Sequence, residues 1–210
     1  MKKLILIVIC LITISSVNAQ KKAVTETGDE IILFDDGTWE YQDDVDLKKT
    51  EIPTNPIQFK KDDNSTFLLK SSKINLGFWL NPKIWSFKKG DENSESEYEI
   101  QLKDGDLYSM ILTEKIEVPL ETLKAIALEN GREAAPDLKI VTEEYRMVNG
   151  IKVLHLQMNG TMLGIKFSYF GYYFSNSNGT VQFITYTSQN LIKEYKKECE
   201  KLLNGLVEIN

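Results

Sequence analysis

The sequence predicts an α+β protein in which helices cover an antiparallel sheet, preceded by an N-terminal β-hairpin. Three observations predict this class. Short runs with apolar and polar residues alternating at period two are separated by Asp-Gly and Asn-Gly turn signals. Two stretches, one in the middle of the chain and one at its end, carry apolar residues at helical spacing. The composition, with 42% hydrophobic and 27% charged residues, is that of a globular chain.

The N-terminal segment has the pattern of a signal peptide. Two lysines precede an apolar run over residues 4–14, and Val17 and Ala19 occupy the −3 and −1 positions of a cleavage site. The run is shorter than the roughly 20 residues that span a bilayer. We therefore expect residues 1–19 to be removed. The mature chain is then a bacterial protein exported to the periplasm or the extracellular space, without a transmembrane segment.

The mature chain is predicted to have three parts. Residues 20–41 form a β-hairpin segment, because two β-rich runs flank an Asp-Asp-Gly turn. Residues 42–64, which are acidic at first and then contain Pro53 and Pro56, form a linker. Residues 65–210 form the main α+β domain.

Strands and helices of the main domain follow from periodicity and turn residues. A hairpin over residues 98–116 turns at an Asp-Gly pair, and a helix over residues 119–130 begins with proline and ends at Gly131. A meander of four strands covers residues 138–187.

The meander and the C-terminal helix complete the domain. Turns at Asn149-Gly150 and Asn159-Gly160 are predicted within the meander, because Asn-Gly favours two-residue hairpin loops. Residues 189–206 are predicted to be an amphipathic helix whose apolar stripe packs on the sheet.

From about Lys73 onward the chain resembles the PsbP-like/DcrB-like group of exported α/β/α proteins. The resemblance rests on residues 78–85, Phe-Trp-Leu-Asn-Pro-Lys-Ile-Trp, together with the mid-chain helix, the meander and the final helix. It implies an α/β/α sandwich that acts as an accessory or binding protein without a shared catalytic site, and it carries over no functional residue. Residues 28–41 are similar to a short segment near the start of exported bacterial proteins of unknown function.

Charge and residue types exclude several functions. Without the signal the chain has 23 Lys+Arg against 31 Asp+Glu, a formal charge of −8, which disfavours nucleic acid as a partner. No metal and no cofactor are predicted. One imidazole, His155, and one thiol, Cys199, remain, and no CxxC, HExxH or glycine-rich phosphate loop is present. Cys199 lies in the apolar stripe of the last helix, where packing is the expected role. Alternation places His155 on the more polar face of its strand, half-exposed.

Aromatic residues crowd one strand of the meander. Alternation places Phe167, Tyr169 and Tyr173 on one face, and Phe170, Tyr172 and Phe174 on the other. Either helices cover both faces, or one face is an exposed aromatic patch of the kind that marks binding. On the second interpretation the candidate ligand- or partner-binding residues are Tyr169, Tyr172, Tyr173 and His155.

These observations predict a non-enzymatic exported envelope protein that binds a protein partner or a small apolar ligand through its sheet. Two alternatives stay open. One is a hydrolase or other enzyme with a site built around His155 and nearby acids. The other is a structural envelope component whose N-terminal hairpin adds a strand to a neighbour's sheet.

Overall fold

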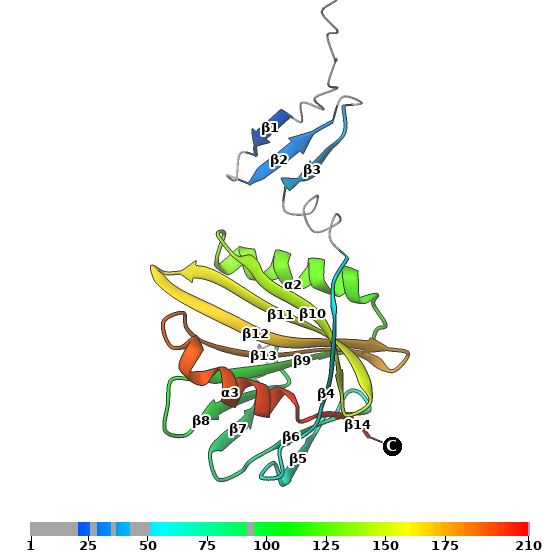
Figure 1. The fold of residues 1–210 in the computed structure, drawn as a ribbon, viewed down its shortest axis with the longest axis vertical. Coiled ribbons are helices and arrows are strands. Elements are labelled where there is room, and N and C mark those ends of the chain that lie inside the picture. The colour runs from blue at the N-terminus through cyan, green and yellow to red at the C-terminus, as the bar shows by residue number, and fades with distance from the viewer. Residues whose placement is uncertain (1–20, 26–28, 35–36, 43–50, 92–94, 210) are drawn as a thin grey trace, which may run out of the picture. The chain divides into compact units, whose positions relative to one another are not determined.

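The structure is a computed structural model that describes residues 21–25, 29–34, 37–42, 51–91 and 95–209 (Figure 1). The predicted signal peptide lies outside the described residues. The chain divides into two compact units, residues 1–51 and 52–210.

The N-terminal unit contains a three-stranded antiparallel sheet. Its strands are β1 (Lys21–Val24), β2 (Glu30–Leu33) and β3 (Trp39–Tyr41), in the order β1-β2-β3. The predicted hairpin is β2–β3, and β1 is an addition to it. Gly37 in the connecting turn has φ of 86°, a conformation that favours glycine. Trp39 and Tyr41 meet edge to face at 5.4 Å and are both exposed.

The main unit is built on an eight-stranded sheet with the order β4-β10-β11-β12-β13-β9-β8-β7. The strands are β4 (Thr54–Phe59), β7 (Trp85–Lys89), β8 (Tyr98–Leu102), β9 (Tyr108–Glu114), β10 (Lys139–Val148), β11 (Ile151–Met162), β12 (Ile165–Asn176) and β13 (Gly179–Ser188). All neighbours are antiparallel except β4 and β10, which are parallel. The sheet is therefore mixed rather than purely antiparallel.

A small sheet and two helices complete the unit. The small sheet has the order β14-β6-β5, with β14 (Leu206–Glu208), β6 (Leu76–Leu80) and β5 (Phe67–Lys70). Helices α2 (Leu120–Ala134) and α3 (Ile192–Leu203) lie on opposite sides of the meander β10–β13 (Figure 1). The α+β class with helices covering the sheet and an N-terminal hairpin is confirmed.

The main core lies between the large sheet, the small sheet and α3. Phe78 of β6 meets Phe183 of β13 edge to face at 5.1 Å, and Leu202 and Leu203 of α3 are buried beside them. Apolar burial on this scale is the principal source of stability for a chain without disulfides. Helix α2 covers part of the opposite face of the meander, over β12.

The predicted linker is wrong in its second half, because residues 54–59 form β4. Tyr145 N donates to Pro53 O at 2.8 Å, and Asn149 N donates to Phe59 O at 2.9 Å. Pro56 is tolerated because β4 is an edge strand, where a missing N–H need not break a ladder. The main unit therefore begins at residue 52 rather than 65.

The predicted turn at Asn159-Gly160 is also wrong. Strand β11 runs through these residues and turns at Leu163-Gly164, where φ is 50° and 80°. A Cβ on Gly160 would lie 3.2 Å from Ala135 Cβ and 3.3 Å from the Leu138 Cα, so glycine serves a close approach here. Tertiary packing overrides the local turn preference.

Both helices differ in their ends from the prediction. Helix α2 continues through Gly131 to Ala134, and its last residues precede a proline at position 136. Helix α3 is shorter than residues 189–206, and the chain leaves it to form β14 beside β6.

Two polar side chains join segments that are distant in sequence. The buried Glu97 carboxylate accepts hydrogen bonds from Ser71 Oγ, Ser72 N, Ser72 Oγ and Thr113 Oγ1, so it ties the β5–β6 loop to β9. Burial raises the pKa of Glu97, but these hydrogen bonds outweigh burial and hold the pKa below its usual value. Asn149 Nδ2 donates to Asn204 O and Leu206 O, while Lys61 N donates to Asn149 Oδ1.

Candidate functional site

Three tyrosines stand in one row across the face of the large sheet that carries α2. Tyr169 of β12 pairs directly with Tyr186 of β13, which pairs directly with Tyr108 of β9. Directly paired residues on adjacent strands place their side chains on the same face. The rings of Tyr108 and Tyr186 are stacked with centroids 5.6 Å apart, and those of Tyr169 and Tyr186 meet edge to face at 5.9 Å.

Helix α2 covers only part of this face. Its buried residues Leu123, Ala127 and Leu128 pack toward β12, where Tyr173 is fully buried. Neither of the two helices in residues 51–91 and 95–209 covers strands β13, β9, β8 and β7 on this side (Figure 1). We call their uncovered surface, together with Tyr169 at its border, the open face.

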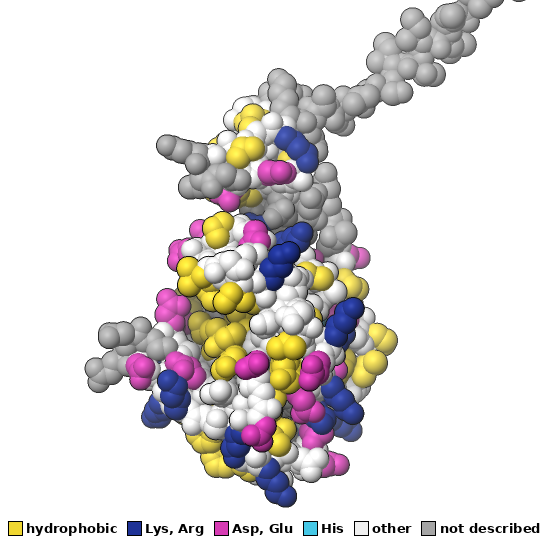
Figure 2. All heavy atoms as spheres, turned by 90° about the vertical axis from the view of Figure 1, so that its left-hand side faces the viewer, with side chains coloured by type: hydrophobic (Ala, Val, Ile, Leu, Met, Phe, Trp, Pro, Cys, Tyr) yellow, Lys and Arg dark blue, Asp and Glu magenta, His cyan; other side chains and the backbone are white. Residues whose placement is uncertain are grey.

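Apolar and aromatic side chains fill the middle of the open face. The next row of paired residues contains Ile184 and Met110, and Leu112 follows on β9. Tyr108, Met110, Leu112, Tyr169 and Tyr186 are all half-buried. Figure 2 looks onto the side of the main unit toward which the β11–β12 hairpin points in Figure 1, and it shows hydrophobic side chains gathered between charged ones.

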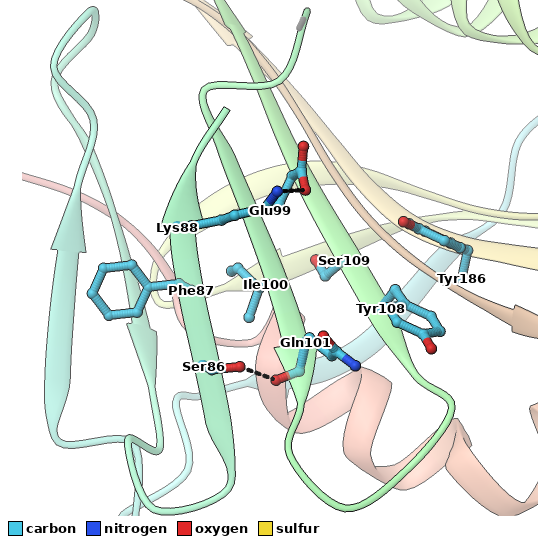
Figure 3. Close-up of a pocket in the computed structure, with 9 residues that line it drawn as sticks. All are labelled: Ser86, Phe87, Lys88, Glu99, Ile100, Gln101, Tyr108, Ser109 and Tyr186. Atoms are coloured by element: carbon cyan, nitrogen blue, oxygen red, sulfur yellow. Dashed lines mark hydrogen bonds and ion pairs between the residues drawn. The ribbon is translucent and has the colours of Figure 1, made fainter. Parts of the chain in front are cut away.

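A shallow groove of about 220 Å³ lies on the open face beside the tyrosines (Figure 3). Tyr108 and Tyr186 form one side, and Ser86, Lys88, Glu99 and Gln101 of β7 and β8 form the other. Lys88 Nζ lies 3.0 Å from Glu99 Oε2, and among the described residues these two are the only charged ones that line the groove. The groove therefore presents an aromatic wall and a polar wall whose charges neutralise each other.

The tyrosine hydroxyls are available to a partner. Among the described residues, none makes a hydrogen bond with the hydroxyls of Tyr108, Tyr169 or Tyr186. Partial burial raises the pKa of Tyr169 and Tyr186, so both phenols stay protonated and can donate at neutral pH. An apolar ring body with a free polar tip is typical of residues at protein interfaces.

The structure brings only one of the predicted site residues to this surface. Tyr169 is half-buried at its border, whereas Tyr172, Tyr173 and His155 are 0%, 0% and 2% exposed. Tyr172 faces the main core, where its hydroxyl donates to Asn204 Oδ1 at 2.8 Å and accepts from Arg146 Nη1 at 3.1 Å. These contacts make Tyr172 part of the packing between β12 and the end of α3.

The half-exposed position expected for His155 is wrong. Its strand face is covered, so the ring lies 4.2 Å from the Phe170 ring and its Nδ1 hydrogen-bonds the Gly171 carbonyl at 3.1 Å. Burial, with the positive charge of Arg146, lowers the pKa of His155 to about 3. The imidazole is therefore neutral at physiological pH and has no access to a substrate.

Cys199 and the acidic runs add no chemical site in the described part of the chain. Cys199 is fully buried, and burial raises the pKa of its thiol to about 11. Residues 51–91 and 95–209, with the described N-terminal strands, contain no group of three His, Cys, Asp or Glu side chains that could hold a metal ion. No helix within these ranges is long and apolar enough to cross a membrane.

The sequence analysis does not predict Tyr108 and Tyr186 as residues of the binding surface. Each is the only tyrosine of its strand on this face, so neither stands out as an aromatic cluster in the sequence. Strands β9 and β13 are separated in sequence by α2 and β10–β12, and their direct pairing brings the two tyrosines together. The available signal was the period-two alternation of both strands.

One solved structure superimposes on this chain closely enough to establish its fold. Cyanobacterial PsbP from Synechocystis sp. PCC 6803 superimposes with a TM-score of 0.51 at 12% identity, covering 70% of this chain and 94% of that one. PA94 from Pseudomonas aeruginosa, a protein of unknown function titled a putative regulator, gives 0.44 at 10% identity over 69% and 97% of the two chains. LpqN of Mycobacterium tuberculosis, described as involved in cell envelope biogenesis, gives 0.43 at 8% identity over 69% and 90%.

The main unit therefore has a PsbP-like fold, as the sequence resemblance implied. No model of a known protein family matches the chain, and no curated protein matches it in sequence.

Proposed function

We propose that this chain is a non-enzymatic exported protein of the cell envelope that binds a protein partner through the open face. The observation that carries the proposal is the row of Tyr108, Tyr186 and Tyr169, whose rings contact one another and whose hydroxyls make no hydrogen bond to another described residue. Export and the envelope location rest on the predicted signal peptide.

A protein partner fits this surface better than a small apolar ligand. Sites for small molecules are concave and enclose 70–90% of the ligand. The groove of about 220 Å³ is shallow and open along one side, and the aromatic row continues beyond it. A broad surface with aromatic residues at the centre and charges at the margin matches the anatomy of a protein interface.

The alternative of an enzyme at His155 loses its support, because that ring is buried and its directly paired neighbour on β10, Glu144, forms an ion pair with Arg146. A general acid or base must reach the proton that it transfers.

Site-specific photo-crosslinking in the intact envelope tests the proposal. A photoreactive side chain at Tyr186 should give one discrete protein adduct, and the same group at the exposed Lys197 of α3 should not. Tyr108→Ala should reduce the adduct about tenfold or more, because a central tyrosine at an interface contributes at this level. An adduct of lipid or small-molecule mass would overturn the protein partner in favour of an apolar ligand, and equal adducts at both positions would overturn the surface.

A further inference from the structure

The turn between β11 and β12 carries three exposed apolar side chains. Met162, Leu163 and Ile165 are 41%, 96% and 62% exposed. We call residues 162–165 the apolar tip. Single exposed hydrophobic residues are ordinary, but three together at the end of a projecting hairpin form a patch.

The backbone conformation makes Leu163 a costly choice at this position. Leu163 and Gly164 have φ of 50° and 80°, close to the 49° and 90° of Asn149 and Gly150 in the preceding hairpin turn. Asparagine tolerates the left-handed region, whereas leucine is disfavoured there. Asn149 also uses its side chain for three hydrogen bonds, while that of Leu163 points into solvent. Folding alone therefore gives no reason for leucine at position 163.

The apolar tip is continuous with the open face. Ile165, Phe167 and Tyr169 alternate along β12 and share the face that carries α2. The rings of Phe167 and Tyr169 are 4.7 Å apart, and the chain of contacts goes on through Tyr186 to Tyr108 at the groove. A projecting apolar tip and an aromatic-walled groove thus lie on one side of one sheet.

We propose that the occupant of the open face is a second copy of this chain, with the apolar tip of each protomer seated in the groove of the other. This inference rests on the proposed function and names its partner. A two-fold interface requires a self-complementary surface, in which the residue that inserts and the pocket that receives it belong to the same patch. The tip and the groove meet this requirement.

Size and charge both fit this arrangement. A cavity of about 150 Å³ holds a benzene ring, so a groove of about 220 Å³ has room for the branched side chain of Leu163. Lys88 and Glu99 neutralise each other at 3.0 Å, so an uncharged tip meets no uncompensated charge there. Insertion also covers the aromatic row that α2 leaves open.

Sedimentation velocity of the mature chain over a concentration series tests the inference. We expect a monomer–dimer equilibrium for the wild-type chain and a monomer for Leu163→Asn. Asparagine suits the turn, so this variant should keep or raise the melting temperature, which separates lost association from lost folding. Ile57→Asn replaces another exposed aliphatic residue, on edge strand β4, and should leave the dimer intact.

An engineered disulfide tests the contact between the apolar tip of one protomer and the groove of the other. Leu163→Cys combined with Gln101→Cys should form an intermolecular disulfide that Gln101→Cys alone does not form, and Cys199 is too buried to interfere. A wild-type chain that stays monomeric at every concentration, or a dimer that survives Leu163→Asn, would overturn the inference. If position 186 then cross-links to a different protein, the proposed function still holds and only the dimer is wrong. If the chain neither self-associates nor cross-links to any protein at position 186, both the dimer and the proposed function are wrong.

Discussion

Removal of one oxygen atom from each of two neighbouring tyrosines should change stability in opposite directions. Tyr172 and Tyr173 follow each other on β12, face opposite sides of the sheet and are both fully buried. The Tyr172 hydroxyl hydrogen-bonds Asn204 and Arg146, whereas the buried Tyr173 hydroxyl has no hydrogen-bond partner in the described part of the chain. Tyr→Phe deletes only the hydroxyl at each position.

The expected magnitudes follow from these contacts. Tyr172→Phe removes two hydrogen bonds, one of them from a cation, and leaves the 6%-exposed Arg146 with fewer acceptors, a loss of about 2–3 kcal/mol. Tyr173→Phe removes a buried hydroxyl that gains nothing from folding, a stabilisation of about 1 kcal/mol. At about 2–4 °C per kcal/mol for a chain of this size, the two melting temperatures should differ by roughly 10 °C.

Urea and thermal unfolding of the mature chain, followed by circular dichroism, measure both changes. Equal m-values would show that neither substitution alters the surface exposed on unfolding. The side chains lie on opposite faces and share no partner, so the double variant should be additive within about 0.5 kcal/mol. If Tyr173→Phe destabilises as much as Tyr172→Phe, the Tyr173 hydroxyl is hydrogen-bonded after all and the reasoning fails.

Three further outcomes are expected. Glu97→Gln should lower stability by about 2 kcal/mol at pH 7. Folding lowers the pKa of Glu97, so the stabilisation by its carboxylate is full above the pKa of the unfolded chain and is lost as the pH falls through the pKa of the folded chain. The melting temperatures of variant and wild type should therefore converge in acid. A difference that stays constant with pH would contradict this. Cys199 should not react with a thiol reagent until the chain unfolds, and rapid native labelling would show that its burial is transient. A chain that starts at residue 52 should keep the melting temperature of the main unit. A chain that starts at residue 65 lacks β4 and should melt about 10 °C lower. Equal melting temperatures would show that β4 does not stabilise the main unit.

The alternation of polar and apolar residues predicted most strands, because one face of each must be buried. It could not say how far a helix covers each aromatic face of β12, since that depends on where α2 and α3 pack. Tyr169 therefore lies at the open face, while Tyr172 and Tyr173 were assigned to a binding surface and lie in the core. The exposure of His155 was wrong for the same reason. The alternation predicts a polar, half-exposed strand face for it, but other parts of the fold cover that face, and His155 is buried against Phe170.

Local turn and breaker signals failed where long-range contacts decide the outcome. Pro56 indicates a linker in the sequence. In the structure β4 is an edge strand, where the missing N–H of proline need not break a hydrogen bond of the sheet. Asn159-Gly160 reads as a hairpin turn, yet Ala135 and Leu138 pack so closely on Gly160 that the strand continues. The same extension carries Leu163 into solvent, which no periodicity argument would anticipate.

The three hydrogen bonds of Asn149 also constrain the order of events during folding. They join the segment after β4, the β10–β11 turn and the chain just before and within β14. Asn55 of β4 lies 89 positions before its partner Glu144 of β10, and β14 pairs with β6, which lies near the start of the main unit. Folding with such distant pairings is slow, because loop closure must precede the contacts that reward it. The core of the main unit, which contains Phe78 of β6 and Leu206 of β14, therefore closes only when these two distant strands have met.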